Sequence, residues 1–167
     1  GNAVEAREAI DYLQGVRRDP RLHDITLLLV AEMLVLGKIV ASVEEGKKRA
    51  QESLDSGRAF EVFEKMVQAQ GGTMVLPQAS YVVDILADRS GTLTAMDTRG
   101  IGNLLVEMGA GRRRAEDKID TRVGFKDIVT LGTKCEPGKT LLARAHVVEK
   151  NTNTASEVRR LLTITGY

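Results

Sequence analysis

The stretch Gly71-Gly72-Thr73-Met74-Val75-Leu76-Pro77 divides the sequence into two halves with different residue patterns. Its two glycines are suited to end a helix, and a proline follows a short apolar segment, which is typical of a linker. Helical spacing dominates before this stretch, and strand and turn patterns dominate after it. We therefore expect an α+β chain with two parts. The predicted boundaries are a helical part at 1–72, a linker at 73–79 and a second domain at 80–167.

Four helices are predicted before the linker. The second, residues 21–36, is apolar nearly all round, which is typical of a helix at the centre of a core. Ser42 and Glu45 have the spacing of a capping box at the start of the third helix. The first and fourth helices each carry one apolar stripe, formed by Ala6, Ala9, Ile10 and Leu13 and by Phe60, Phe63 and Val67.

Short strands are predicted after the linker, because β-branched residues and period-two alternation recur there. A short helix with Asp97 or Thr98 as its cap interrupts them. A second short helix is expected in the tail. The predicted strands are 81–86, 91–96, 127–131 and 140–148, and the predicted helices are 100–108 and 155–162.

Composition excludes several classes of protein. The chain has 167 residues, of which 43% are apolar and 28% charged, a globular balance that argues against disorder. Its formal charge of +1 gives no support to a nucleic-acid partner. The longest apolar run, residues 25–37, is too short and too polar to span a membrane. Cys135 is the single cysteine, which excludes an internal disulfide and favours a cytoplasmic location.

The glycine-rich segments do not complete a dinucleotide-binding motif, because Leu105 and Arg114 occupy the positions of the third glycine. Arg112, Arg113 and Arg114 follow such a segment and could contribute to an anion-binding cleft, since arginine offers a bidentate fork. The alternative is a solvated turn, in which these arginines pair with Glu116, Asp117 or Asp120. The two histidines, His23 and His146, are expected to be structural, and the lone cysteine is expected to be an incidental thiol.

A turn with Gly132 and Gly138 resembles that of biotinyl and lipoyl carrier domains. Such a carrier needs a lysine at the tip of a second hairpin, and Met96-Asp97-Thr98 has none. A swinging-arm carrier is therefore disfavoured, although its sheet architecture could be shared.

A succession of short motifs along nearly the whole chain closely resembles the C-terminal part of the pyrimidine nucleoside phosphorylases. The thymidine phosphorylase branch is the nearest in pattern, chiefly through Met96-Asp97-Thr98-Arg99. The other motifs are Gly1-Asn2-Ala3-Val4-Glu5, Asp19-Pro20-Arg21-Leu22, Ala31-Glu32-Met33-Leu34, Met66-Val67-Gln68-Ala69-Gln70-Gly71-Gly72, Met108-Gly109-Ala110-Gly111-Arg112, Asp117-Lys118-Ile119-Asp120, Val123-Gly124-Phe125 and Ala145-His146.

This resemblance implies a fold and an activity. The helical part would complete an α/β domain, and the second part would be a C-terminal α/β hammerhead, similar to a barrel-sandwich. The family performs phosphorolysis of pyrimidine nucleosides, with phosphate and the nucleoside as ligands, and acts as a cytoplasmic homodimer. Its phosphate- and base-binding residues lie upstream of the stretch present here. The chain is therefore expected to hold no catalytic residue and to be inactive alone.

Two sites carry over by resemblance. Glu8 matches one ligand of a monovalent cation such as potassium, and no other cofactor is implied. The loop from Gly109 to Glu116 resembles one that approaches the cleft on domain closure, so Gly109, Gly111, Arg112, Arg113 and Arg114 are its candidate residues. The alternative is a free-standing structural or interaction module of the same fold without catalysis.

Overall fold

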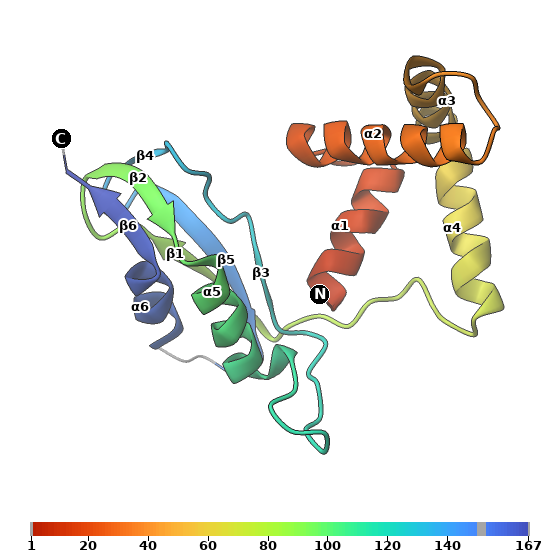
Figure 1. Cartoon of the computed structure of the whole chain (residues 1–167). Helices are drawn as coiled ribbons and strands as arrows, with labels where there is room; N and C mark the ends of the chain where they lie inside the picture. The colour runs from red at the N-terminus through yellow and green to blue at the C-terminus, as the bar shows by residue number, and fades with distance from the viewer. Residues whose placement is uncertain (1, 150–152, 167) are drawn as a thin grey trace. The chain divides into compact units, whose positions relative to one another are not determined.

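The computed structural model describes residues 2–149 and 153–166 (Figure 1). It divides the chain into two compact units. The helical unit is Ala6–Leu76, and the C-terminal unit combines Gly1–Glu5 with Pro77–Tyr167. The boundary near residue 76 lies within the predicted linker. The first residues of the chain, in contrast, were expected in the helical part and belong to the C-terminal unit instead.

The helical unit is built from four helices, as the sequence predicts. Asp19 caps the second helix and accepts a hydrogen bond from the Leu22 amide at 3.1 Å. Ser42 is the predicted N-cap of the third helix and accepts a hydrogen bond from the Glu45 amide at 3.2 Å. Glu45 in turn accepts from the Ala41 amide at 3.0 Å, close to the reciprocal bond of a capping box. The helices are α1 (Ala3–Leu13), whose first residues belong to the other unit, α2 (Pro20–Leu36), α3 (Val43–Asp55) and α4 (Arg58–Ala69).

Helix α2 is not the centre of a core, contrary to the prediction. Ala31 is its one buried residue, and it packs against Gly46 of α3. Met33 is 67% exposed and Leu36 is 80% exposed. The reason is that, among the described residues, the helical unit supplies no second layer to cover this face of α2. Its exposed large apolar side chains are Leu22, Ile25, Leu28, Leu29, Met33 and Leu36.

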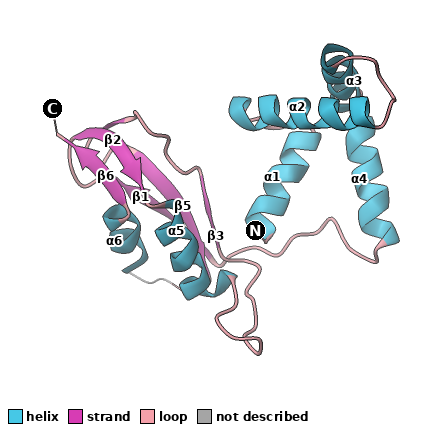
Figure 2. Ribbon diagram, viewed as in Figure 1, coloured by secondary structure: helices cyan, strands magenta, loops and turns pink. Residues whose placement is uncertain are grey.

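The C-terminal unit contains two three-stranded antiparallel sheets (Figure 2). One has the order β1-β5-β3 and the other the order β4-β2-β6. In the first sheet, the register runs from Tyr81 opposite Val147 to Leu86 opposite Leu141. The strands are β1 (Tyr81–Leu86), β2 (Gly91–Met96), β3 (Gly124–Lys126), β4 (Lys134–Cys135), β5 (Leu141–Val147) and β6 (Leu162–Thr165).

Two helices, α5 (Thr98–Leu105) and α6 (Asn153–Arg160), lie on the same side of these strands (Figure 2). Both sheets and both helices contribute to a single core. Ile85, Leu93 and Leu142 are fully buried in it, and Ile101 and Val158 join it from the helices. The α+β class is therefore confirmed, and the two small sheets share one apolar centre.

The strand predicted at 127–131 is wrong. The extended segment lies earlier, at β3, and ends where Asp127 adopts a left-handed conformation with φ 52°. The carboxylate of Asp127 accepts a hydrogen bond from Arg144 at 2.7 Å, which holds the bend. Strand β6 was not predicted at all. Tail residues 151, 152 and 167 lie outside the described residues. Among those described, no helix combines the length and the apolar character that crossing a bilayer requires.

Candidate functional site

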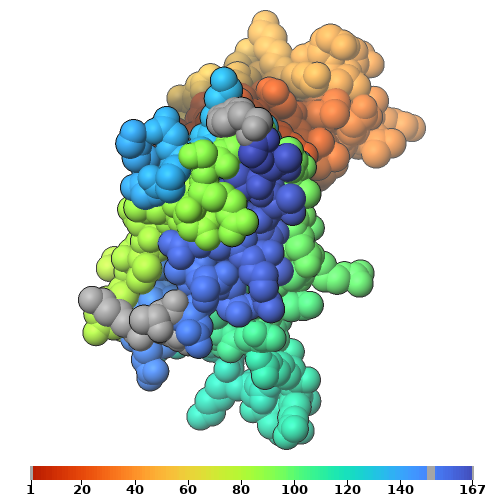
Figure 3. Space-filling view, turned by 90° about the vertical axis from the view of Figure 1, so that its left-hand side faces the viewer, coloured from red at the N-terminus to blue at the C-terminus, as the bar shows by residue number. Residues whose placement is uncertain are grey.

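The segment that carries the three adjacent arginines begins at the end of α5. The chain continues from α5 into one wider helical turn, η1 (Val106–Ala110), which Gly109 breaks with φ 96°. A Cβ added at Gly111 would lie 2.8 Å from Cγ2 of Val106. Both positions therefore require glycine, one for its backbone angle and one for lack of space. We call Gly109–Arg114 the arginine loop; in the space-filling view its surroundings protrude from the C-terminal unit (Figure 3).

Asp117 organises the backbone of the arginine loop. Its Oδ2 accepts hydrogen bonds from the Arg113 amide at 2.9 Å and the Arg114 amide at 3.0 Å. The amides of Arg114 and Arg113, with the positive charges of Arg113 and Arg112 nearby, hold the pKa of Asp117 below its ordinary value. The carboxylate is therefore ionised at neutral pH, and it accepts hydrogen bonds from backbone amides of the loop and not from the guanidinium groups.

The arginine side chains extend into solvent. Arg113 lies 4.0 Å from Glu107, and both side chains are about 60% exposed, so this pair contributes little. Asp120, one of the acids expected to pair with them, instead binds Arg122 at 2.7 Å. Within the part of the chain that the structure describes, no acid forms an ion pair with Arg112 or Arg114. Two cationic groups therefore remain available to an anion.

The first residues of the chain lie against the arginine loop. Nδ2 of Asn2 donates a hydrogen bond to the carbonyl oxygen of Ala110 at 2.8 Å, across 108 residues of sequence. The Ala3 amide donates to the carbonyl oxygen of Thr121 at 3.0 Å. Two motifs about a hundred residues apart in the sequence therefore contact each other. Both motifs were identified from the sequence, but their contact was not, because sequence patterns do not predict contacts between residues so far apart in the chain.

A third contact completes this arrangement. A Cβ added at Gly124 in β3 would lie 2.7 Å from Cγ2 of Val4. Val4 therefore packs directly on the backbone of the sheet, which explains why glycine stands in Val123-Gly124-Phe125. We call the contacts of Asn2, Ala3 and Val4 with the C-terminal unit the N-terminal clasp.

Glu8 lies on α1 beyond the N-terminal clasp, and its side chain is exposed. Among the described residues, no group of three or more His, Cys, Asp or Glu side chains could hold a metal ion, so Glu8 belongs to no such cluster. The cation site therefore stays a prediction. One carboxylate at an exposed helical position is too little to select a cation by itself.

The histidines and the cysteine occupy structural positions. His23 Nδ1 and the Tyr12 hydroxyl are hydrogen-bonded at 2.9 Å within the helical unit. His146 is half-buried in β5, and burial, with the charges of Lys126 and Arg144, lowers its pKa. Cys135 is buried. Among the described residues, the hydrogen-bond partner of the Cys135 thiol is the Thr133 carbonyl oxygen, 3.7 Å from Sγ, and not a histidine.

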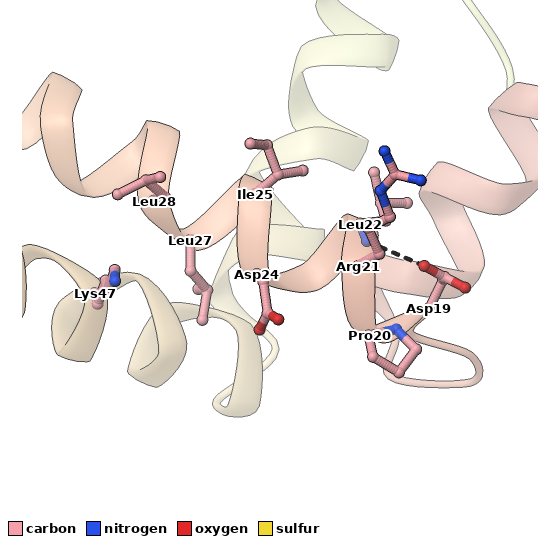
Figure 4. A pocket seen from close by; sticks show the side chains of 9 residues that line it. All are labelled: Asp19, Pro20, Arg21, Leu22, Asp24, Ile25, Leu27, Leu28 and Lys47. Carbon is pink, nitrogen blue, oxygen red and sulfur yellow. Dashed lines mark hydrogen bonds between the residues drawn. The ribbon is translucent and has the colours of Figure 1, made fainter.

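An open groove of about 1090 Å³ runs along the start of α2 and was not predicted from the sequence. Leu22, Ile25, Leu27 and Leu28 line it, with Asp24 and Lys47 among its polar residues. Ile25 and Leu27 point to different sides of the helix (Figure 4). These side chains do not converge on one point, so the groove is part of the exposed face of α2 and has no arrangement suited to catalysis.

Comparison with models of protein families finds two matches. Residues 92–165 match the pyrimidine nucleoside phosphorylase C-terminal domain. Residues 1–60 match the glycosyl transferase family, a/b domain. The first match contains the arginine loop, and the second contains Asn2, Ala3 and Val4 as well as Glu8. The N-terminal clasp therefore joins the segments recognised by the two models.

Proposed function

Because the chain belongs to the thymidine and pyrimidine nucleoside phosphorylase family, whose members are pentosyltransferases, we propose that a protein containing it catalyses the reversible phosphorolysis of thymidine. The products are thymine and 2-deoxyribose 1-phosphate. The observation that carries this proposal is the pair of family matches together with the clasp that joins them. Preference for thymidine rests on the resemblance of Met96-Asp97-Thr98-Arg99 to the thymidine phosphorylase branch.

In this reaction a phosphate oxygen forms a bond to the anomeric carbon while the bond from that carbon to N1 of the base breaks. The electron pair of the broken bond leaves with the base, which takes up a proton. In the transition state the sugar carries positive charge. Groups that place phosphate and hold the charge of the departing base do most of the work. The residues of this chain would contribute positive potential from the arginine loop, where Arg112 and Arg114 remain free to meet an anion.

We also propose that the helical unit is one layer of the α/β domain. Residues 1–60 match an a/b domain, yet the described residues of this stretch form helices only. A sheet from elsewhere in the protein would cover the exposed apolar face of α2, and burying Met33 and Leu36 would stabilise that packing by about 1.5–3 kcal/mol each. The predicted division into 1–72, as part of the α/β domain, and 80–167, as the C-terminal domain, is then proposed with one change: residues 1–5 go with the C-terminal domain.

The remaining assignments follow from the family. Phosphate and a pyrimidine nucleoside are the proposed ligands, and a monovalent cation such as potassium would use Glu8 with ligands from outside this chain. A cytoplasmic homodimer is the proposed form of the protein. Sedimentation of the protein with and without potassium tests the dimer and its dependence on the cation.

The test of the proposed function is an assay of thymine released from thymidine and phosphate, followed by chromatography. We expect release by a longer protein that contains this chain, and none by the 167-residue chain alone. Turnover by the chain that survives repurification would contradict the second expectation. Uridine assayed in parallel decides the base preference.

A second candidate is a non-catalytic interaction module of the same fold. The exposed apolar face of α2 favours it, because large apolar patches on a soluble surface mark interaction sites. Mass and peptide mapping of the native protein separate the two candidates. A much longer polypeptide supports the enzyme, whereas a natural chain starting at Gly1 supports the module.

A further inference from the structure

Asn2 combines two properties that few residues offer together. Its backbone has φ 79°, in the left-handed region that asparagine tolerates better than most residues other than glycine. Its side-chain amide provides the N–H that donates to the Ala110 carbonyl at 2.8 Å. Glycine would fit the backbone but lacks the donor, and aspartate would fit the backbone but presents only acceptors when ionised.

The hydrogen bond from Asn2 is made at the most flexible part of the arginine loop. Ala110 stands between Gly109 and Gly111, the two residues with the greatest conformational freedom in the loop. The Gly109 carbonyl accepts from the Asp120 amide at 2.8 Å, and the Ala110 carbonyl accepts from Asn2. The carbonyl groups of Gly109 and Ala110, which precede the arginines, therefore both accept hydrogen bonds from residues outside the loop.

The other side of the loop is held by Asp117, which binds the amides of Arg113 and Arg114. The arginines are therefore mobile in their side chains but confined in their backbone. Of the bonds that confine it, the one from Asn2 comes from the start of α1 and not from the neighbouring sequence.

We propose that Asn2 is a positioning residue, which sets the backbone of the arginine loop and couples it to the start of α1. This proposal rests on the proposed function in one respect, namely that the arginines of the loop act on phosphate. The coupling itself depends only on contacts within the C-terminal unit. The bond from Ala3 to Thr121 and the packing of Val4 on Gly124 hold the segment independently, so the Asn2 side chain can be removed without releasing it.

The test compares amide hydrogen exchange in the parent chain with Asn2→Asp and Asn2→Gly. Both variants accept the left-handed backbone and remove the donated bond. The control is Asn103→Asp, which makes the same change at an exposed position of α5 in the same unit. We expect exchange at the amides of Arg113, Arg114 and Asp120 to become about fivefold faster in both Asn2 variants, as for loss of one net hydrogen bond. The amides of β1 and β5, and all amides of the control, should keep the parental rates.

Unchanged exchange at the loop amides in both Asn2 variants would overturn the proposal, as would faster exchange spread evenly over the unit. Kinetics of a longer, active protein then separate this inference from the proposed function. There we expect Asn2→Asp to raise KM for phosphate about fivefold with kcat nearly unchanged. Faster exchange at the loop without any kinetic change would uphold the positioning role and contradict the role of the arginines in phosphate binding.

Discussion

Gly46 of α3 lies directly against Ala31 of α2, so close that a Cβ on Gly46 would stand 2.8 Å from the Ala31 Cα. The two helices therefore meet backbone to backbone at this point. Ala31 is fully buried there, while most of the apolar face of α2 is exposed. This single close approach thus sets the separation of the two helices in the helical unit.

Gly46→Ala should destabilise the helical unit by about 1–3 kcal/mol, because the helices must separate to admit a methyl group. The gain in helix propensity, about 1 kcal/mol, offsets only part of this loss. The matched control is Gly102→Ala on α5, where an added Cβ meets nothing within 4 Å and should be neutral or stabilising. Urea unfolding followed by circular dichroism measures both. Equal stability of Gly46→Ala and the parent would show that the helices can move apart freely.

Gly124→Ala should weaken the N-terminal clasp, since the new methyl group overlaps Cγ2 of Val4 at 2.7 Å. Removing the obstacle with Val4→Ala should restore most of the lost stability in the double variant. A double-mutant cycle of unfolding free energies is the measurement, with a coupling of about 1 kcal/mol expected. Strictly additive effects of the two substitutions would contradict the contact.

The arginine loop should loosen in acid. The pKa of Asp117 in the folded chain lies below its ordinary value of 3.8, so its bonds to the Arg114 and Arg113 amides are complete above that pH. They are lost as the pH falls through the lowered pKa. Amide signals of Arg113 and Arg114 followed by NMR should therefore titrate with a midpoint below 3.8. Asp117→Asn should abolish this transition, and a midpoint above 3.8 in the parent would refute the prediction.

Arg112→Ala, Arg113→Ala and Arg114→Ala should each raise KM for phosphate in a longer, active protein. Because these side chains are solvated, each effect should be about 1 kcal/mol or less, which is up to roughly fivefold. A larger effect at one position would identify an arginine whose side chain loses its water when the domains close over the cleft. Arg89→Ala, at an exposed arginine of the same unit that pairs with its neighbour Asp88, is the control and should keep the parental kinetics. If all three loop variants behave like Arg89→Ala, the loop is a solvated turn.

Local signals predicted the longer elements well. Asp19 and Ser42 mark helix starts because their side chains accept backbone bonds, and such caps are visible in the sequence. The strands β3, β4 and β6 are two to four residues long, too short for an alternating pattern to develop. At Asp127 a local signal was overlooked, because aspartate is depleted in strands and adopts a left-handed backbone more readily than most residues.

Long-range relationships escaped prediction. The apolar pattern of α2 predicted a helix at the centre of a core, and that prediction was wrong, because the pattern alone does not say which other segment would cover the helix. The bond between Asn2 and Ala110 joins residues 108 apart, and neither residue type is unusual alone. The candidate residues of the arginine loop could be named from the sequence, whereas the clasp that holds the loop required the fold.

The C-terminal unit is discontinuous in the chain, because Asn2, Ala3 and Val4 belong to it although more than seventy residues of the other unit follow them. A polypeptide excised at Pro77 would leave the Ala110 and Thr121 carbonyls without these donors and would bare the sheet at Gly124. Exchange of this unit between homologous proteins by recombination must therefore transfer two segments at once. A crossover in the linker alone would combine a loop from one parent with a clasp from the other.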